Sequence, residues 1–324
     1  MKRSTIEQLA NWIAGQREIA LVCHVSPDGD TLGSALALWR ALLSLGKKAQ
    51  VFCASSIPEM YSFLPGIEQV SNADEVKLRS VLCVDVASRD RMGKYEAILD
   101  ECESACIDHH GTNEGYCDVN VVEGEASATG VVVIKLLDAL GVSMDREMAT
   151  CLYAAISSDT GRFMYSLTNA EALRAGARCL EQPIDVDEIG FWLFRRRTLA
   201  RNKLLAYALN HMFLTDSGRI AVIGLPQSAY AESGAASGDA EGIVNYGIET
   251  SGVEVAIQAK EQNEKQTKFS LRSRGALDVS KVAARLGGGG HANAAGVTID
   301  LPMDQAVAQV LEEIRAQMKI QAEA

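Results

Sequence analysis

The chain has 324 residues, of which 48% are hydrophobic and 23% charged, and its formal net charge at pH 7 is −11. A single small module is excluded, because one hydrophobic core stops growing well below this length. No apolar run approaches the roughly 18 residues that a membrane-crossing helix needs, so we expect no membrane partner. The acidic total argues against coating of long DNA or RNA, which gains affinity by neutralising many phosphates, but it is compatible with a short nucleotide in a locally basic cleft.

The N-terminal segment and the cysteines indicate the compartment. The first 20 residues have a basic start but then alternate apolar and charged residues in helical fashion. They lack the apolar block of an export signal, which predicts a cytoplasmic protein. All eight cysteines lie between Cys23 and Cys179 without a C-x-x-C pair, a distribution that fits neither a disulfide framework nor a thiolate zinc site. We interpret them as small buried residues.

The first half of the chain alternates short apolar runs with helix-like stretches. Predicted strands are 19–24, 49–55, 80–87, 104–110 and 118–123. Predicted helices begin near Thr31, Ser127 and Asp145, and the first ends at Gly46, a residue type that often terminates helices. This alternation predicts a doubly wound, mostly parallel α/β sheet covered on both faces, in a first domain of residues 1–184.

The second half predicts a helical linker and a smaller domain. The segment 185–212 has aromatic and leucine residues at helical spacing and no Pro or Gly after Gly190, which predicts one long helix or a helix pair. Beyond it we expect a hairpin around Ser217 and Gly218, a loop at 232–242 before another helix, and a second hairpin over 253–275. An amphipathic helix starts at Met303. These elements predict a second α/β domain, residues 213–324.

Acidic and imidazole side chains gather where the predicted strands and helices end. They are His24, Asp28, Asp30, Asp85, Asp108, His109, His110 and Asp159. Because the carboxyl ends of parallel strands face one crevice, we expect these groups to converge. Converging carboxylates repel, and a pair of divalent cations resolves the repulsion; a mixed set of Asp oxygens and His nitrogens suits Mn²⁺ better than Ca²⁺. Taken alone, Asp28-Gly29-Asp30 is more typical of a turn or a helix N-cap.

Two motifs carry a resemblance to a known family. Asp28-Gly29-Asp30 and Asp108-His109-His110, with Asp85 between them and Asp159 after, resemble the pattern of the DHH phosphoesterases. The segment GGGGHANAAG, residues 287–296, resembles the glycine-rich motif of the DHHA1 substrate-binding domain. The two-domain plan is most similar to the bacterial nano-RNases. These are bifunctional oligoribonucleases that also convert 3′-phosphoadenosine 5′-phosphate (pAp) to AMP.

The resemblance implies a two-metal centre with two Mn²⁺ per chain, Mg²⁺ or another divalent ion being the alternative. One ion would be bound by His24, Asp28 and Asp85, and the other by Asp30, Asp85, His109 and Asp159. Asp85 would thus bridge the ions, His110 would contact the scissile phosphate, and Asp108 would orient the site. A bridging hydroxide is then expected to attack phosphorus in line.

The resemblance also implies that the second domain binds a short RNA or nucleotide. The predicted substrate-binding residues are Arg272, Arg274, Gly288, Gly289, Gly290, His291 and Arg162. Glycines can bring backbone N–H groups close to a phosphate, and the histidine adds a donor. The first two arginines, two apart on a predicted strand, point to one face and can grip a 5′-phosphate, although a solvated strand edge is the alternative.

Other functions stay open at this stage. Relatives with the same two domains cleave cyclic di-AMP or its linear product pApA, and sequence motifs do not separate these activities. Family II pyrophosphatases carry a different second domain, and RecJ-type exonucleases are generally larger. A non-catalytic nucleotide sensor would need a missing metal ligand, and none is missing. Related proteins are often dimers, so a homodimer is open, and we interpret the basic run 195–197 as a solvated surface or partner contact.

Overall fold

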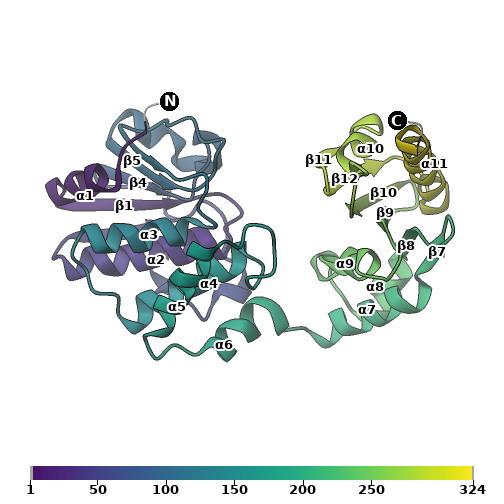
Figure 1. Ribbon diagram of the computed structural model, residues 1–324, viewed down its shortest axis with the longest axis horizontal. Helices are drawn as coiled ribbons and strands as arrows, with labels where there is room; N and C mark the ends of the chain where they lie inside the picture. The colour runs from purple at the N-terminus through teal and green to yellow at the C-terminus, as the bar shows by residue number, and fades with distance from the viewer. Residues whose placement is uncertain (1–2, 323–324) are drawn as a thin grey trace. The chain divides into compact units, whose positions relative to one another are not determined.

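The computed structural model describes the backbone of residues 3–322 and the side chains of residues 3–318. The chain divides into two compact units, Met1–Arg196 and Arg197–Ala324, each built around a six-stranded sheet (Figure 1). This confirms the predicted α/β class. Within the described residues, no helix combines the length and the apolar character needed to cross a membrane.

The sheet of the first unit is entirely parallel, with the strand order β3-β2-β1-β4-β5-β6. Its strands are β1 (Glu18–Cys23), β2 (Lys48–Phe52), β3 (Val70–Ser71), β4 (Ser80–Val84), β5 (Glu103–Asp108) and β6 (Val119–Val122). All five predicted strands are present. The two-residue β3 was not predicted, because so short a strand shows no alternation of apolar and polar residues.

The two faces of this sheet are covered differently. One face packs against α1 (Ile6–Gly15), α2 (Gly29–Ser44) and α3 (Thr129–Ala139). α4 (Arg146–Asp159) and α5 (Ala170–Leu180) pack on α2 and α3 and form an outer layer (Figure 1). The other face packs against η3 (Arg89–Asp100), a 3₁₀ segment that contributes Met92 and Tyr95 to a second core. We expected covering on both faces but did not predict a 3₁₀ segment; Gly93, with φ of 60°, interrupts helical geometry there. Two short 3₁₀ turns, η1 (Glu59–Tyr61) and η2 (Ile67–Gln69), precede β3.

Glycines allow three helices to pack closely. A Cβ added to Gly33 of α2 would lie 2.3 Å from the carbonyl oxygen of Cys151 in α4. A Cβ added to Gly130 of α3 would lie 2.9 Å from the methyl group of Ala155, also in α4. Backbones this close have room for no side chain. The start of α2 and the end of α4 are also close together, since a Cβ added to Gly29 would lie 2.6 Å from Oγ of Ser158.

The predicted linker 185–212 forms a helix pair rather than one long helix. In it, α6 (Val186–Gly190) continues into the π-helical turn η4 (Phe191–Arg195), and α7 (Leu199–His211) starts anew. The side chain of Thr198 accepts a hydrogen bond from the amide of Arg201 and so caps α7. Threonine at this position is an N-cap signal. The boundary between the two units, at Arg196 and Arg197, falls between the two helices.

Two arginines of the basic run bind groups of their own unit. Arg195 donates hydrogen bonds to the backbone and the carboxylate of Asp187. Arg196 pairs with Glu59 and lies 4.5 Å from the ring centroid of Trp192. These contacts favour a structural role for both side chains within the first unit.

The second unit has a mixed sheet with the order β11-β12-β10-β9-β8-β7, in which only β8 and β9 are parallel among the described strands. Its strands are β7 (Phe213–Thr215), β8 (Ile220–Leu225), β9 (Val255–Asn263), β10 (Gln266–Ser273), β11 (Gly289–His291) and β12 (Ala294–Ile299). Both predicted hairpins, β7–β8 and β9–β10, are present. The glycine-rich segment also forms part of a hairpin, β11–β12, which we did not predict.

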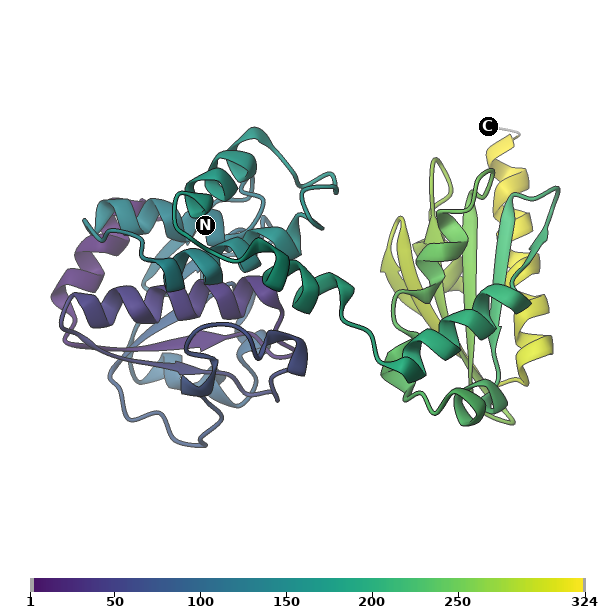
Figure 2. The ribbon, with the colours of Figure 1, turned by 90° about the horizontal axis from the view of Figure 1, so that it is seen from below.

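Helices cover the second sheet on both sides. α7, α8 (Gln227–Ser233) and α9 (Ile243–Ile248) pack on one face, and α10 (Val279–Arg285) and α11 (Met303–Ala322) pack on the other. The turn η5 (Ser237–Ala240) lies within the predicted loop 232–242. Figure 2 shows the long α11, in yellow, beside the strands of this sheet.

Replacing Gly33 with alanine should destabilise the first unit. Alanine gains about 1 kcal/mol in helix propensity, but overpacking against the α4 backbone costs about 3 kcal/mol. We therefore expect the free energy of unfolding to fall by about 2 kcal/mol. The three tryptophans, Trp12, Trp39 and Trp192, all lie in the first unit, so the urea midpoint from tryptophan fluorescence measures this unit alone.

The control for this substitution is Gly15→Ala. Gly15 ends α1, and a Cβ added there meets nothing within 4 Å. This variant should keep the midpoint of the original chain or raise it slightly. A Gly33→Ala protein as stable as the control would contradict the close packing of α2 and α4.

Candidate functional site

The predicted metal-binding residues lie at the carboxyl edge of the parallel sheet. β1 pairs with β2 on one side and β4 on the other, so the chain order reverses at β1 and β4. Ligand-binding crevices of open α/β sheets form at such a switch point. His24 directly follows β1, and Asp85 directly follows β4.

One group of side chains, the His24 group, consists of His24, Asp28 and Asp85. Nε2 of His24 lies 3.5 Å from Oδ2 of Asp28 and 3.5 Å from Oδ2 of Asp85. Nδ1 of His24 lies 2.9 Å from the carbonyl oxygen of Val25. Nη2 of Arg91 lies 3.2 Å from the same Nδ1. In the tautomer with its proton on Nδ1, the ring donates to Val25, and Nε2 faces the carboxylates.

Asp28 has two roles. Its Oδ1 accepts hydrogen bonds from the amides of Asp30 and Thr31 and thereby caps α2. Its Oδ2 faces His24. The helix-cap interpretation of Asp28-Gly29-Asp30 and the ligand interpretation are therefore compatible, because each uses a different oxygen.

A second group, the His109 group, consists of Asp30, His109 and Asp159. Nε2 of His109 lies 3.7 Å from Oδ2 of Asp30 and 3.2 Å from Oδ2 of Asp159. Nδ1 of the same ring lies 3.1 Å from the carbonyl oxygen of Ala126, which fixes the ring as Val25 fixes that of His24. Potential ligand atoms lie within 4.8 Å of one another in both groups, so each can hold a metal ion.

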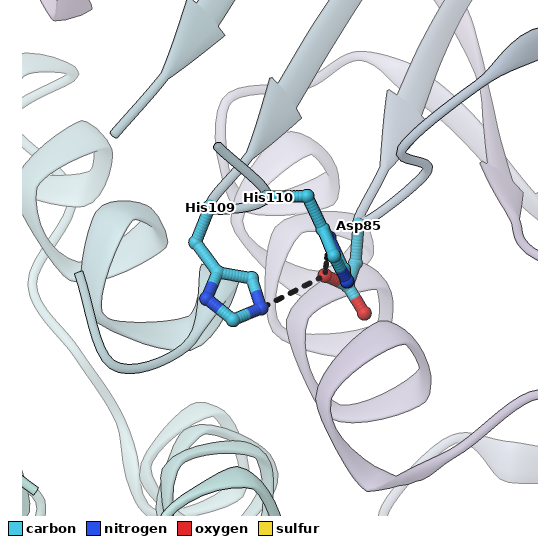
Figure 3. A group of neighbouring side chains, drawn as sticks. All are labelled: Asp85, His109 and His110. Carbon is cyan, nitrogen blue, oxygen red and sulfur yellow. Dashed lines mark ion pairs between the residues drawn. The ribbon is translucent and has the colours of Figure 1, made fainter. Parts of the chain in front are cut away.

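Asp85, a member of the His24 group, also faces the His109 group. Its Oδ2 faces the His24 group, and its Oδ1 lies 3.7 Å from Nε2 of His109 and accepts a hydrogen bond from Thr129 Oγ1 at 2.8 Å. The residue has a φ of 61°, a left-handed conformation that costs energy for a residue with a Cβ. Figure 3 shows its carboxylate beside the rings of His109 and His110.

Asp108 holds His110 in place. Asp108 is fully buried, and its Oδ1 accepts hydrogen bonds from the amides of His109 and His110 and lies 2.8 Å from Nδ1 of His110. Its Oδ2 accepts a hydrogen bond from the side-chain amide of Asn113, which also donates to the carbonyl oxygen of Val86. The ring of His110 is thus fixed by a carboxylate that is itself fixed on both oxygens.

Sequence analysis missed the residues that hold Asp30. The carboxylate of Asp30 accepts hydrogen bonds from the amides of Thr129 and Gly130, at 2.6 and 2.9 Å, and from Oγ of Ser34 at 3.1 Å. The first two donors are at the start of α3, where unpaired amides and the helix dipole favour negative charge. The predicted helix start near Ser127 was the available signal. Asn113 was also missed, although it follows the DHH motif closely.

The charges of the site fit divalent cations. Burial, reinforced by repulsion from Asp85 and Asp159, raises the pKa of Asp30, and burial also raises the pKa of Asp85. Burial alone would lower the pKa of His24, but hydrogen bonds with Asp28 and Asp85 outweigh it and raise the pKa to about 10. The carboxylates thus hold positive charge on the imidazole. A divalent cation can supply that charge instead, because ligating histidines are neutral.

The second unit brings two predicted substrate-binding residues together. His291 of β11 pairs with Ala294 of β12, and Ala294 pairs with Arg272 of β10. Residues directly opposite each other point to the same face of a sheet. His291 and Arg272 therefore lie on one face, on either side of a small residue.

The glycine-rich segment is closely packed within the second unit. The amide of Gly288 donates to the carbonyl oxygen of Ala283 at the end of α10, so this amide is already hydrogen-bonded within its unit. A Cβ on Gly288 would lie 2.2 Å from the carbonyl oxygen of Gly296, and one on Gly290 would lie 2.5 Å from that of Ala294. These glycines are required for close pairing with β12. Gly289, between them, has open space where a Cβ would stand.

The two other predicted arginines belong to other parts of the chain: Arg274 follows the end of β10, and Arg162 is in the first unit. β10 ends at Ser273, so the prediction that Arg272 and Arg274 share a strand is wrong; the backbone of Arg274 bonds to Glu254 instead. Arg162 belongs to the first unit, where its guanidinium group lies 5.1 Å from the ring centroid of Phe194.

Replacing Asn113 with alanine should destabilise the first unit by about 1–3 kcal/mol, because it removes a hydrogen bond to a buried carboxylate oxygen of Asp108. The urea midpoint from tryptophan fluorescence again reports the change. The exposed Asn11→Ala is the control and should shift stability by less than about 0.5 kcal/mol. Equal midpoints for the two variants would show that Asn113 does not support Asp108.

Comparisons with known proteins agree with this geometry. The DHH family, N-terminal domain, matches residues 18–156, and the DHHA1 domain matches residues 220–320. The bifunctional oligoribonuclease and PAP phosphatase NrnA of Thermus thermophilus is 36% identical over 93% of this chain and 90% of its own length. The protein of the same name from Bacillus subtilis is 25% identical over 87% of this chain and 89% of its own.

A solved structure extends the similarity to the whole fold. The crystal structure of an exopolyphosphatase-related protein from Bacteroides fragilis matches with a TM-score of 0.87 and 28% identity, covering 96% of this chain and 95% of the other. The sequence identity to the Thermus protein, the two matched domains and the DHH geometry point to one assignment. The chain belongs to the DHH family, with a DHHA1 domain after its N-terminal DHH domain.

Proposed function

We propose that the protein degrades short oligoribonucleotides from the 3′ end and removes the 3′-phosphate of pAp to give AMP. It is a hydrolase of phosphoric ester bonds, the class to which both named relatives belong. The observation that carries the proposal is the position of Asp85, whose two carboxylate oxygens face two different groups of potential metal ligands. A bridging carboxylate of this kind suits a pair of ions acting on one phosphate.

In this proposal the first unit binds two divalent cations, with Mn²⁺ as the preferred ion. The ligands would be His24, Asp28 and Asp85 for one ion, and Asp30, Asp85, His109 and Asp159 for the other. When bound, such a pair supplies a water of lowered pKa as the nucleophile and stabilises charge on the attacking and leaving oxygens. The carbonyl oxygens of Val25 and Ala126 keep both imidazole rings oriented for this role.

His110 would act on the phosphate itself. Its hydrogen bond with Asp108 outweighs burial and raises the pKa of His110, which favours the imidazolium form. Because Nδ1 is bonded to Asp108, Nε2 is the nitrogen available to a substrate. We assign it to stabilising negative charge on a phosphate oxygen or protonating the leaving oxygen. Asp108 is then a positioning residue.

The second unit would bind the 5′ end of the substrate. Arg272 offers a planar guanidinium group, which matches the geometry of a phosphate, and His291 offers a second donor on the same face. Between them stands Ala294, and the neighbouring row of the sheet contains Gly296 and Gly289. Small side chains leave room for a nucleotide to lie close to the strands.

A substrate panel tests the proposed function. With Mn²⁺, purified protein should release phosphate from pAp and mononucleotides from linear dinucleotides, and both should react faster than cyclic di-AMP or a long RNA. A chelator should stop all turnover. Faster cleavage of cyclic di-AMP than of pAp and linear dinucleotides would replace this proposal with a cyclic-dinucleotide phosphodiesterase. Binding of pAp without any release of phosphate would indicate a sensor.

Replacing Asp85 with asparagine should lower kcat/KM by more than about 100-fold, because even groups that only orient metal ligands contribute 10–100-fold. Asparagine tolerates the left-handed backbone, so the fold should persist. In the original chain, Mn²⁺ at about 100 times its Kd should raise stability by about 2.7 kcal/mol, and Asp85→Asn should lose most of this gain in a thermal melt. The exposed Asp90→Asn serves as the control and should behave like the original chain.

A further inference from the structure

One face of the second sheet is only partly covered by helices. On this face the residues of β9 up to Gln258 are buried, and Gln258 bonds to Val244 and Ala240 beneath α9. Beyond Gln258, the residues on this face of β9, β10, β12 and β11 are half-buried or exposed. We call them the open face: Lys260, Lys268, Ser270, Arg272, Gly289, His291, Ala294, Gly296 and Thr298.

The strand register arranges the open face in rows. His291, Ala294 and Arg272 form one row, and Gly289, Gly296 and Ser270 form the next. The third row contains Thr298, Lys268 and Lys260. The proposed function uses the first row for a 5′-phosphate and leaves the third row without a role.

The third row places two positive charges directly opposite each other. Lys268 and Lys260 are register partners on the antiparallel strands β10 and β9. Like charges in such a pair destabilise a sheet. Burial, followed by repulsion from Lys268, lowers the pKa of Lys260. The pair is therefore an unfavourable arrangement for the sheet taken alone.

Neither lysine has an ion-pair partner among the described residues. Glu241 is close enough to act on the pKa of Lys260, but within residues 3–318 no carboxylate forms an ion pair with either lysine. By contrast, Lys94, Lys135 and Lys281 all have acidic partners. An anion bound from solution would offset the repulsion between the two ammonium groups.

We propose that Lys260 and Lys268 form a second phosphate-binding subsite, which contacts an internal phosphate of an oligonucleotide whose 5′ end lies at Arg272 and His291. This inference rests on the proposed function and adds the substrate class that uses the subsite. None of the nine residues of the open face is acidic, and the carboxylate that acts on Lys260, Glu241, lies outside this set.

The spacing of the rows decides which substrates reach the subsite. Four residues of β10 separate Lys268 from Arg272, which is about 13 Å at about 3.3 Å per residue. The two phosphates of pAp are attached to the same ribose and cannot span this distance. An oligonucleotide of several residues can. The subsite therefore strengthens binding of oligonucleotides and leaves the binding of pAp unchanged.

The test is the double variant Lys260→Gln, Lys268→Gln, assayed with Mn²⁺ on 5′-phosphorylated penta-adenylate and on pAp. We expect KM for penta-adenylate to rise about 10-fold, with kcat changed less than about 2-fold, and both constants for pAp to stay unchanged. The slope of log(kcat/KM) against log[salt] for penta-adenylate should become shallower by about 0.7, the value for one phosphate contact on a single strand.

The matched control is Lys48→Gln, Lys203→Gln, which removes the same charge from two exposed lysines of other elements, β2 and α7. It should leave KM for both substrates unchanged. An unchanged KM for penta-adenylate in the Lys260 and Lys268 variant overturns the subsite, as does an equal rise of KM for pAp. If the original chain hydrolyses neither substrate, the proposed function is itself wrong and the subsite is rejected with it.

Discussion

The structure of the first unit depends on how the repulsion among buried carboxylates is compensated at the switch point of its sheet. Asp30 and Asp85 are almost completely buried beside Asp28 and Asp159, and burial of charge is costly unless it is compensated. The chain compensates part of the charge with the amides at the start of α3 and with two imidazoles. A pair of cations can neutralise the negative charge that remains. The stability of the fold and the chemistry of the site therefore both require positive charge at this point.

Close packing of helices is what brings these charges together. Asp30 is in the first turn of α2 and Asp159 ends α4, and the two helices approach at Gly33, where no side chain fits. The left-handed backbone of Asp85 directs its carboxylate between the two groups. The close helix approach permits only glycine, and the left-handed backbone of Asp85 costs energy. Such features are typical of functional sites that the surrounding structure holds in place.

The sequence predicted the parallel sheet because its strands are short, apolar and bounded by polar turns. It also predicted that His24, Asp85 and His109 lie near one another, since the carboxyl ends of parallel strands face one crevice. The residues that hold these side chains by hydrogen bonds were not predicted. Asn113 and Thr129 are ordinary turn and helix-start residues in the sequence, and only tertiary contacts reveal that they bond to Asp108 and Asp85.

The glycine-rich segment shows why residue type alone did not predict the role of each glycine in the second unit. The glycines were predicted to bring backbone N–H groups close to a phosphate. In the structure, Gly288 and Gly290 are required because β12 passes too close for a Cβ. Their effect on function is indirect, since this hairpin sets the register that aligns His291 with Arg272. The same register aligns Lys268 with Lys260. Strand pairing therefore turns residues distant in sequence into an ordered series of basic groups, whose rows are separated by the rise of about 3.3 Å per residue along the strand.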